Sequence, residues 1–179
     1  MMDVIERVLI SKEEMEENAK ELGNRISKDY EGKELVIIGV LKGGFIFLAD
    51  LARNISIPVE LDFMSVSSYG DSSKSSGVVR IIKDVDTNID GKHVLIVEDI
   101  IDTGLTLNHL VELLKTRGPL SVKICAALDK PSRRKVNVKI DYKGIEIPDE
   151  FVVGYGLDYS GKYRNIPEVC VLKREIYMK

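Results

Sequence analysis

The sequence is poor in cysteine, with only Cys125 and Cys170 among its 179 residues. Both lie in apolar segments, KICAAL and EVCVLK, and we therefore expect two buried free thiols. Two such residues argue against a disulfide framework and against a metal site built on cysteine.

Long apolar runs and clusters of one charge are also missing. No apolar stretch approaches the roughly 18 residues of a membrane span, and acids occupy the first twenty residues where a secretion signal needs an apolar core. The net charge is −3, the pI is near 5.5, and the basic residues are scattered. These absences predict a cytoplasmic protein with no membrane and no nucleic-acid partner.

Two common nucleotide-binding motifs, GxxxxGK[ST] and GxGxxG, do not occur in the chain. The segment DTNIDG at 86–91 imitates the start of a calcium loop, but position twelve of that loop is Val97, and an apolar strand follows where a helix should. Ordinary dinucleotide, nucleoside triphosphate and calcium sites are therefore not expected.

The composition, 44% hydrophobic and 31% charged, fits one globular domain that spans residues 1–179. An amphipathic helix is predicted over 11–30, because Ser11 and Glu14 form a capping box and four apolar residues recur on one face: Met15, Ala19, Leu22 and Ile26.

Apolar strands then alternate with helices along the chain. Strands are predicted at 34–41, 59–70, 77–85, 92–98, 122–128 and 150–156, with helices at 45–53 and 105–118. The polar segment 67–77 is predicted to be a mobile loop. This alternation is typical of an α/β protein with a parallel sheet covered on both faces, whose ligands bind beyond the carboxyl ends of the strands.

One such strand end carries an unusual set of polar residues, VLIVEDIIDTGLTL at 94–107. The start of a helix after Asp102 offers free backbone N–H groups and two threonine hydroxyls, which together favour a phosphate. Glu98 and Asp99 would repel a phosphate but could accept hydrogen bonds from a vicinal diol, directly or through a cation. A ribose 5-phosphate satisfies both requirements.

Other interpretations of this segment are weaker. A strand that ends in acids also occurs in phosphoacceptor receiver domains, but there it stands near the amino terminus, whereas 93 residues precede it here. A purely structural role, with acids that cap the helix and threonines that satisfy a turn, would suffice for one Asp and one Thr. It accounts poorly for the full set.

The segment closely resembles the phosphoribosyl diphosphate (PRPP) motif of the type I phosphoribosyltransferases. Five further motifs occur in the order and approximate spacing of the hypoxanthine (guanine) branch of that family: LKGG at 41–44, SSYG at 67–70, DKP at 129–131, EFVVGYGLDY at 150–159 and KYRN at 162–165. The resemblance implies a central, mostly parallel sheet flanked by helices, with a small hood formed by the terminal segments. It also implies a reaction in which a 6-oxopurine displaces diphosphate from C1 of PRPP with Mg²⁺.

The same resemblance implies roles for individual residues. The 5-phosphate of PRPP would be held by Asp102, Thr103, Gly104, Leu105 and Thr106. Asp102 also resembles the acid/base residue near N7 of the purine, and Glu98 and Asp99 resemble residues that bind the ribose hydroxyls and magnesium. The diphosphate ligands would be Lys42, Gly43 and Arg164, and in the family the Leu41–Lys42 peptide can be cis.

For the base, Lys130 resembles the donor to the purine 6-oxo group, Phe151 the ring that stacks on the purine, and Val152 a backbone contact. Asp158 resembles the carboxylate that reaches a second magnesium ion, and Ser68 and Tyr69 resemble a lid over the diphosphate. Without their motifs, Phe151 would be an ordinary core aromatic, Lys130 and Arg164 solvated charges, and the lid a hairpin without a role.

Two alternatives remain. Regulators with this fold bind PRPP and control nucleic acid, but the chain keeps the base-specific residues and lacks a basic face. A relative that acts on xanthine is harder to distinguish, because xanthine differs only at the purine 2-position. The resemblance suggests a homodimer or homotetramer, and we expect only structural roles for His93 and His109.

Overall fold

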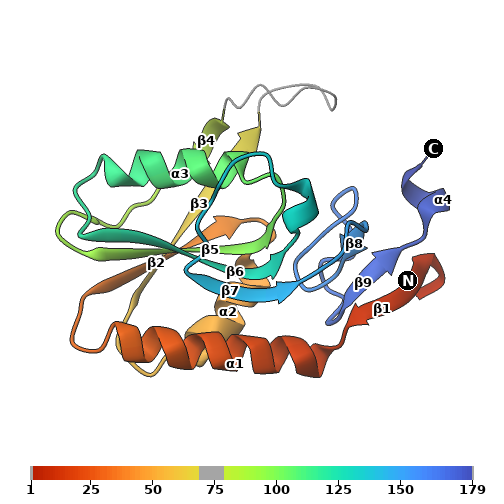
Figure 1. The fold of residues 1–179 in the computed structure, drawn as a ribbon, viewed down its shortest axis with the longest axis horizontal. Helices are drawn as coiled ribbons and strands as arrows, with labels where there is room; N and C mark the ends of the chain where they lie inside the picture. The colour runs from red at the N-terminus through yellow and green to blue at the C-terminus, as the bar shows by residue number, and fades with distance from the viewer. Residues whose placement is uncertain (1, 69–78, 179) are drawn as a thin grey trace.

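The computed structural model describes residues 2–68 and 79–178 and is built on a six-stranded sheet in the order β4-β3-β2-β5-β6-β7 (Figure 1). The strands are β2 (Leu35–Leu41), β3 (Glu60–Ser68), β4 (Val79–Lys83), β5 (His93–Ile101), β6 (Ser121–Asp129) and β7 (Tyr142–Glu146). All neighbouring pairs are parallel except β3 with β4. The predicted α/β fold with a mostly parallel sheet is confirmed.

Helices cover both faces of this sheet. Helices α1 (Lys12–Asp29) and α2 (Phe45–Arg53) lie on one side and α3 (Leu105–Lys115) on the other (Figure 1). The predicted capping box is present, since the Glu14 N–H donates to Ser11 Oγ at 3.1 Å and the Ser11 N–H donates to the Glu14 carboxylate at 2.8 Å. The four apolar residues predicted for one face of α1 are all buried.

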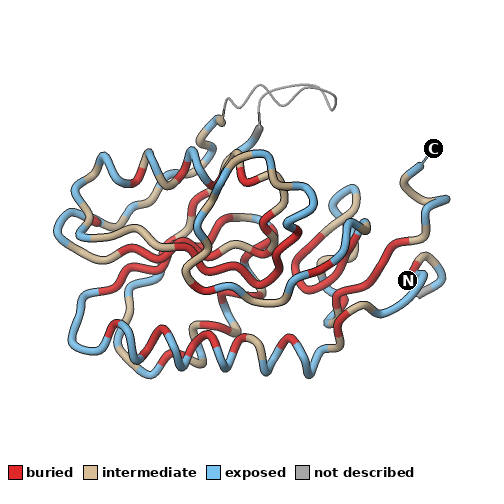
Figure 2. Tube along the Cα trace, in the orientation of Figure 1, coloured by how far each residue is buried: buried red, intermediate tan, exposed pale blue. Residues whose placement is uncertain are grey.

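The central strands are buried on both sides, as Figure 2 shows along β2 and β5. Successive residues of β2 alternate between two cores: Leu35 and Ile37 pack with α1 and α2, while Val36 and Ile38 pack with α3. Side chains of a strand point alternately to opposite faces, so a continuous apolar run is what a doubly covered parallel strand requires.

The terminal segments form a second, three-stranded sheet in the order β1-β9-β8, at the right of Figure 1. It contains β1 (Ile5–Ile10), β8 (Val152–Val153) and β9 (Val169–Leu172), all antiparallel. Short 3₁₀ turns span Met2–Val4 and Pro131–Arg133, and the last helix, α4, spans Arg174–Tyr177. The predicted hood of terminal segments is confirmed.

The prediction that 150–156 adds a strand to the parallel sheet is wrong. Within this segment only Val152 and Val153 form a strand, β8, and they pair with β9 in the hood. The chain then turns through positive φ angles at Gly154 (91°), Tyr155 (49°) and Gly156 (97°), which a strand cannot contain. The parallel position is taken by β7, whose short sequence YKGIE carries too weak an apolar pattern to be predicted.

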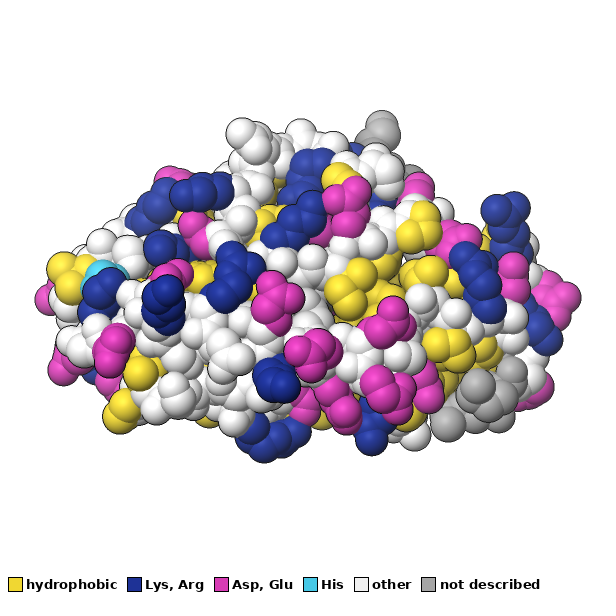
Figure 3. Space-filling model, turned by 60° about the horizontal axis from the view of Figure 1, so that its bottom comes forward, with side chains coloured by type: hydrophobic (Ala, Val, Ile, Leu, Met, Phe, Trp, Pro, Cys, Tyr) yellow, Lys and Arg dark blue, Asp and Glu magenta, His cyan; other side chains and the backbone are white. Residues whose placement is uncertain are grey.

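Both cysteines are buried free thiols, as predicted. No helix within 2–68 or 79–178 is long and apolar enough to cross a membrane. On the face in Figure 3, Lys and Arg side chains are interspersed with Asp and Glu side chains.

Candidate active site

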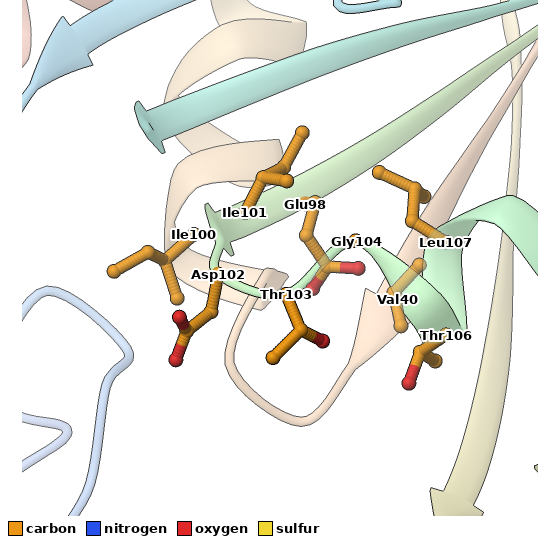
Figure 4. A pocket seen from close by; sticks show the side chains of 9 residues that line it. All are labelled: Val40, Glu98, Ile100, Ile101, Asp102, Thr103, Gly104, Thr106 and Leu107. Carbon is orange, nitrogen blue, oxygen red and sulfur yellow. The ribbon is translucent and has the colours of Figure 1, made fainter. Parts of the chain in front are cut away.

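The 94–107 motif lines a cavity of about 210 Å³ at the carboxyl end of β5. Its walls are Val40, Glu98, Ile100, Ile101, Asp102, Thr103, Gly104, Thr106 and Leu107. Figure 4 shows the side chains of Asp102, Thr103 and Thr106 projecting to the same side of the loop between β5 and α3. Leu105 begins α3 and does not line the cavity.

Gly104 shapes the entry into α3. It caps the helix with a φ of 80°, in the left-handed region, and a Cβ there would lie 2.9 Å from Val138 and 3.2 Å from Arg134. Only glycine meets both conditions without strain. The Leu105 N–H makes a long hydrogen bond of 3.4 Å to Thr103 Oγ1. Because glycine has no side chain to accept from the N–H groups that follow, those donors are available to an anion in the cavity.

Glu98 and Asp99 belong to β5, a few residues before the loop that leads to α3. Glu98 lines the cavity, whereas Asp99 is buried behind it and accepts a hydrogen bond from the Ile100 N–H at 2.7 Å. Burial, and then the neighbouring Asp99 carboxylate, raise the pKa of Glu98 well above its usual value. Burial also raises the pKa of Asp99. A bound cation would stabilise both ionised carboxylates and reverse this effect.

The loop after β2 packs directly on Asp99. A Cβ on Gly43 would fall 1.6 Å from Asp99 Oδ2, and a Cβ on Gly156 would fall 2.1 Å from the Gly43 carbonyl oxygen. The Leu41–Lys42 peptide bond is cis, and Lys42 is exposed. The Gly43 backbone therefore approaches Asp99 more closely than a residue with a side chain could.

Arg164 contacts the segment after β8, whose Gly156 packs on this loop. Its guanidinium donates to the Gly156 carbonyl oxygen at 2.6 Å and pairs with Asp158 at 2.8 Å. The Arg164 charge also opposes the rise in the Asp99 pKa. Two predicted diphosphate ligands, Gly43 and Arg164, therefore lie near Asp99. Asp158 lines neither cavity and is paired with Arg164.

A second cavity, of about 380 Å³, opens next to the first. It is lined by Ile100, Asp102, Lys130, Arg133, Asp149, Glu150, Phe151, Val152, Leu157 and Tyr177. Lys130 is buried, and its ammonium donates to the Glu150 carbonyl oxygen at 2.8 Å. Phe151, by contrast, is 37% exposed. All three residues predicted to contact the base are brought together here.

Asp102 and Ile100 line both cavities. Arg133 Nε lies 3.4 Å from Asp102 Oδ1, but this oxygen, although buried, has no hydrogen-bond partner among the described residues. A proton donor on a ligand in the second cavity would supply the missing hydrogen bond.

Comparison of the sequence with known proteins agrees with this arrangement of the site. A family model described as the phosphoribosyl transferase domain matches residues 8–160. This chain belongs to the phosphoribosyltransferase family. A hypoxanthine-guanine phosphoribosyltransferase of Bacillus subtilis is 54% identical over 173 residues, which cover 97% of this chain and 96% of that protein. Another, of Lactococcus lactis, is 55% identical and covers 98% of this chain and 95% of that protein.

A solved phosphoribosyltransferase structure shares the whole fold. The crystal structure of a hypoxanthine phosphoribosyltransferase from Staphylococcus aureus matches with a TM-score of 0.96 at 48% identity, over 99% of this chain and 96% of that chain. The family membership predicted from six separate motifs is confirmed.

Some site residues were not predicted from sequence. Arg133 and Tyr177 line the second cavity, but no motif marks them, and Tyr177 belongs to a terminal segment without any recognisable pattern. Arg133 follows the DKP motif by two residues, and this closeness to Lys130 in the sequence was the one available indication. Of the predicted lid, Ser68 ends β3 and Tyr69 lies outside the described residues.

Proposed function

We propose that this phosphoribosyltransferase is a purine salvage enzyme that transfers the 5-phosphoribosyl group of PRPP to hypoxanthine or guanine. The products are IMP or GMP and diphosphate. A bond forms between a ring nitrogen of the base and C1 of the ribose, while the bond from C1 to the diphosphate oxygen breaks. We place the phosphoribosyl group in the 210 Å³ cavity, called the phosphate cavity below, and the base in the 380 Å³ cavity, called the base cavity. Both belong to a single domain that spans residues 1–179.

The observation that carries this proposal is the position of Asp102 between the two cavities, with a buried oxygen that pairs with Arg133 but accepts no hydrogen bond from the described residues. A carboxylate there can accept the proton that the base must release as its nitrogen attacks C1. The helix start and the two threonine hydroxyls on the other side would hold the 5-phosphate. The reacting atoms would meet where the cavities meet.

Lys130 supports a preference for 6-oxopurines. Its buried ammonium already donates to a carbonyl oxygen, and it would donate to the 6-oxo group of hypoxanthine or guanine. Adenine presents an amino donor at that position, so one hydrogen bond would be unmet at a cost of about 1–3 kcal/mol. Phe151 offers an exposed ring face for stacking, and Val152 offers backbone beside it.

The residues fit a role for Mg²⁺. No group of three or more His, Cys, Asp or Glu side chains gathers as a metal site in the part of the chain that is described. Mg²⁺ commonly binds through one or two carboxylates together with water and substrate oxygens, and Glu98 and Asp99 provide that pair, with Asp158 as a candidate on the diphosphate side. When bound, Mg²⁺ would neutralise charge on the diphosphate as it leaves.

The direct test incubates the purified protein with PRPP and Mg²⁺ and follows nucleotide formation separately with hypoxanthine, guanine, xanthine and adenine. We expect turnover with the first two bases, and loss of turnover when a chelator removes Mg²⁺. Turnover with xanthine alone would move the assignment to a xanthine-specific transferase. PRPP binding without turnover of any base would contradict the enzymatic function and favour the regulatory alternative.

We also propose a cytoplasmic enzyme that assembles as a homodimer or homotetramer. Sedimentation equilibrium over a range of protein concentrations tests the assembly, and a species with the 20.1 kDa mass of one chain at every concentration would contradict it.

A further inference from the structure

Phe151, the one ring predicted to meet the base, is in contact with two further aromatic rings, of which one also lines the second cavity. The Phe151 and Tyr177 rings are stacked, with centroids 4.8 Å apart and planes inclined by 21°. Tyr159 approaches Phe151 edge-on, with centroids 5.7 Å apart and planes at 87°. Tyr177 and Phe151 both line the cavity.

The hood holds Tyr177 in place. The Tyr159 hydroxyl donates to the Ile176 carbonyl oxygen at 3.0 Å, so the ring that supports the edge of Phe151 also anchors the short helix α4. The Lys173 N–H, just before α4, donates to the Val4 carbonyl oxygen at 3.0 Å. Ile176 and Tyr177 pack against the small hood core. The stack therefore belongs to a connected part of the fold.

Phe151 needs such support. It is 37% exposed, and an exposed side chain that must adopt one orientation to bind a ligand loses rotamer freedom on binding. Tyr177 is stacked on one face of its ring, so a planar base would stack on the opposite face.

We propose that Tyr177 is a positioning residue for the purine: its ring fixes the plane of Phe151 before the base arrives. This inference rests on the proposed function, because it assumes that Phe151 stacks on the base. It assigns a part of base binding to the C-terminal helix, which carries none of the motifs of the reaction.

The test compares steady-state kinetics of Tyr177→Leu and Tyr177→Phe with the unaltered protein. Because stacked aromatic pairs contribute modestly beyond their buried area, we expect Tyr177→Leu to raise the KM for hypoxanthine about 3- to 10-fold. The KM for PRPP and kcat should stay within about 2-fold, because the phosphate cavity does not include Tyr177. Tyr177→Phe keeps the ring and should restore the unaltered KM. Met178→Leu, at a neighbouring position that is 71% exposed, serves as the matched control.

Three results would overturn the inference. The first is a lower KM for hypoxanthine in Tyr177→Leu, which would mean that the Tyr177 ring competes with the base. The others are equal increases in the KM for hypoxanthine and the KM for PRPP, or equal effects of Tyr177→Leu and Tyr177→Phe on the KM for hypoxanthine. Phe151→Leu, measured in parallel, separates this inference from the proposed function. If Phe151→Leu leaves the KM for hypoxanthine unchanged, the proposed base site is wrong. If it raises that KM while Tyr177→Leu does not, only the role of Tyr177 is wrong.

A tryptophan variant keeps the test available if Tyr177→Leu does not fold. The sequence contains no tryptophan, so Tyr177→Trp introduces a single fluorescent reporter that can still stack on Phe151. We expect its emission to change as IMP is titrated in, and the change to be lost when Phe151→Leu is combined with it. Emission that is insensitive to saturating IMP would contradict the proposed position of residue 177.

Discussion

The two cavities that meet at Asp102 are built in different ways. Of the nine described residues that line the phosphate cavity, eight belong to the continuous segment 98–107, and the ninth is Val40. The base cavity draws its walls from the end of β5, the loop after β6, the hood and α4. The first is one strand–loop–helix unit whose shape local backbone geometry largely decides, whereas the second exists only when distant segments pack together. We therefore expect substitutions to separate PRPP binding from base binding.

The largest effect is expected at Asp102, the ionisable residue that lines both cavities. Asp102→Asn keeps the size of the side chain but removes its ability to take a proton, so kcat should fall about 1,000-fold, while the KM for PRPP should change by less than about 3-fold. Steady-state kinetics with each substrate varied in turn measure this. Glu112→Gln, on the exposed side of α3, is the control for charge. Losses of similar size in kcat and in PRPP affinity would contradict the acid/base role.

A slightly smaller effect is expected where backbone packs on the acids. In Gly43→Ala the new methyl group would collide with Asp99, and displacement of catalytic groups by about 1 Å can cost about 100-fold in rate. We expect kcat/KM for PRPP to fall by about that factor. Gly32→Ala is the control: a Cβ there meets no atom of the described residues within 4 Å, and its φ of 73° makes the change cost stability, but kinetics should be unchanged. Unaltered kinetics in Gly43→Ala would show that the close contact with Asp99 is not needed.

The base cavity can be altered by itself through Lys130. Lys130→Met removes a buried donor, and loss of its hydrogen bond to the 6-oxo group, at about 1–3 kcal/mol, should raise the KM for hypoxanthine about 10-fold or more without changing the KM for PRPP. Kinetics with both substrates, alongside melting temperatures, provide the measurement. Lys135→Met, exposed in the following loop, is the matched control. A selective loss of PRPP affinity would reverse the assignment of the two cavities.

The smallest effect on activity is expected at Asp62, which lines neither cavity. Burial alone would raise its pKa, but backbone N–H groups of Thr87, Phe63 and Asp86 donate to it and together lower the pKa to about 2. A carboxyl whose pKa is lower in the folded state stabilises the fold above its unfolded pKa of about 3.9, and that stabilisation is lost as the pH falls toward 2.

Urea unfolding of Asp62→Asn and of the unaltered protein between pH 2 and pH 7 measures this contribution. We expect a difference in the free energy of unfolding of about 2 kcal/mol near neutral pH, which shrinks below about pH 4. Kinetic constants should be unchanged at 25 °C. A difference that is independent of pH would mean that the Asp62 charge does not stabilise the fold.

The sequence by itself determined the α/β class, the helix at 11–30 and the phosphate cavity, because each depends on residues that are neighbours along the chain. Local sequence signals mark each of them. The capping box marks the start of the first helix, the apolar run marks a buried strand, and the glycine before α3 marks the turn into that helix. The family motifs also identified Lys130 and Phe151, but the sequence did not show how these separate positions are arranged in space.

Tertiary structure alone decided how those points meet. The segment at 150–156 is apolar enough for a central strand, yet its glycines turn it into the hood, and β7 takes the parallel position with a weak apolar pattern. Arg133 reaches Asp102, and Tyr177 reaches Phe151, only because the hood and the loop after β6 close over the carboxyl end of the sheet. Such contacts depend on packing between segments far apart in the chain, and periodicity in a sequence records which face of an element is buried but not which distant residue will lie against it.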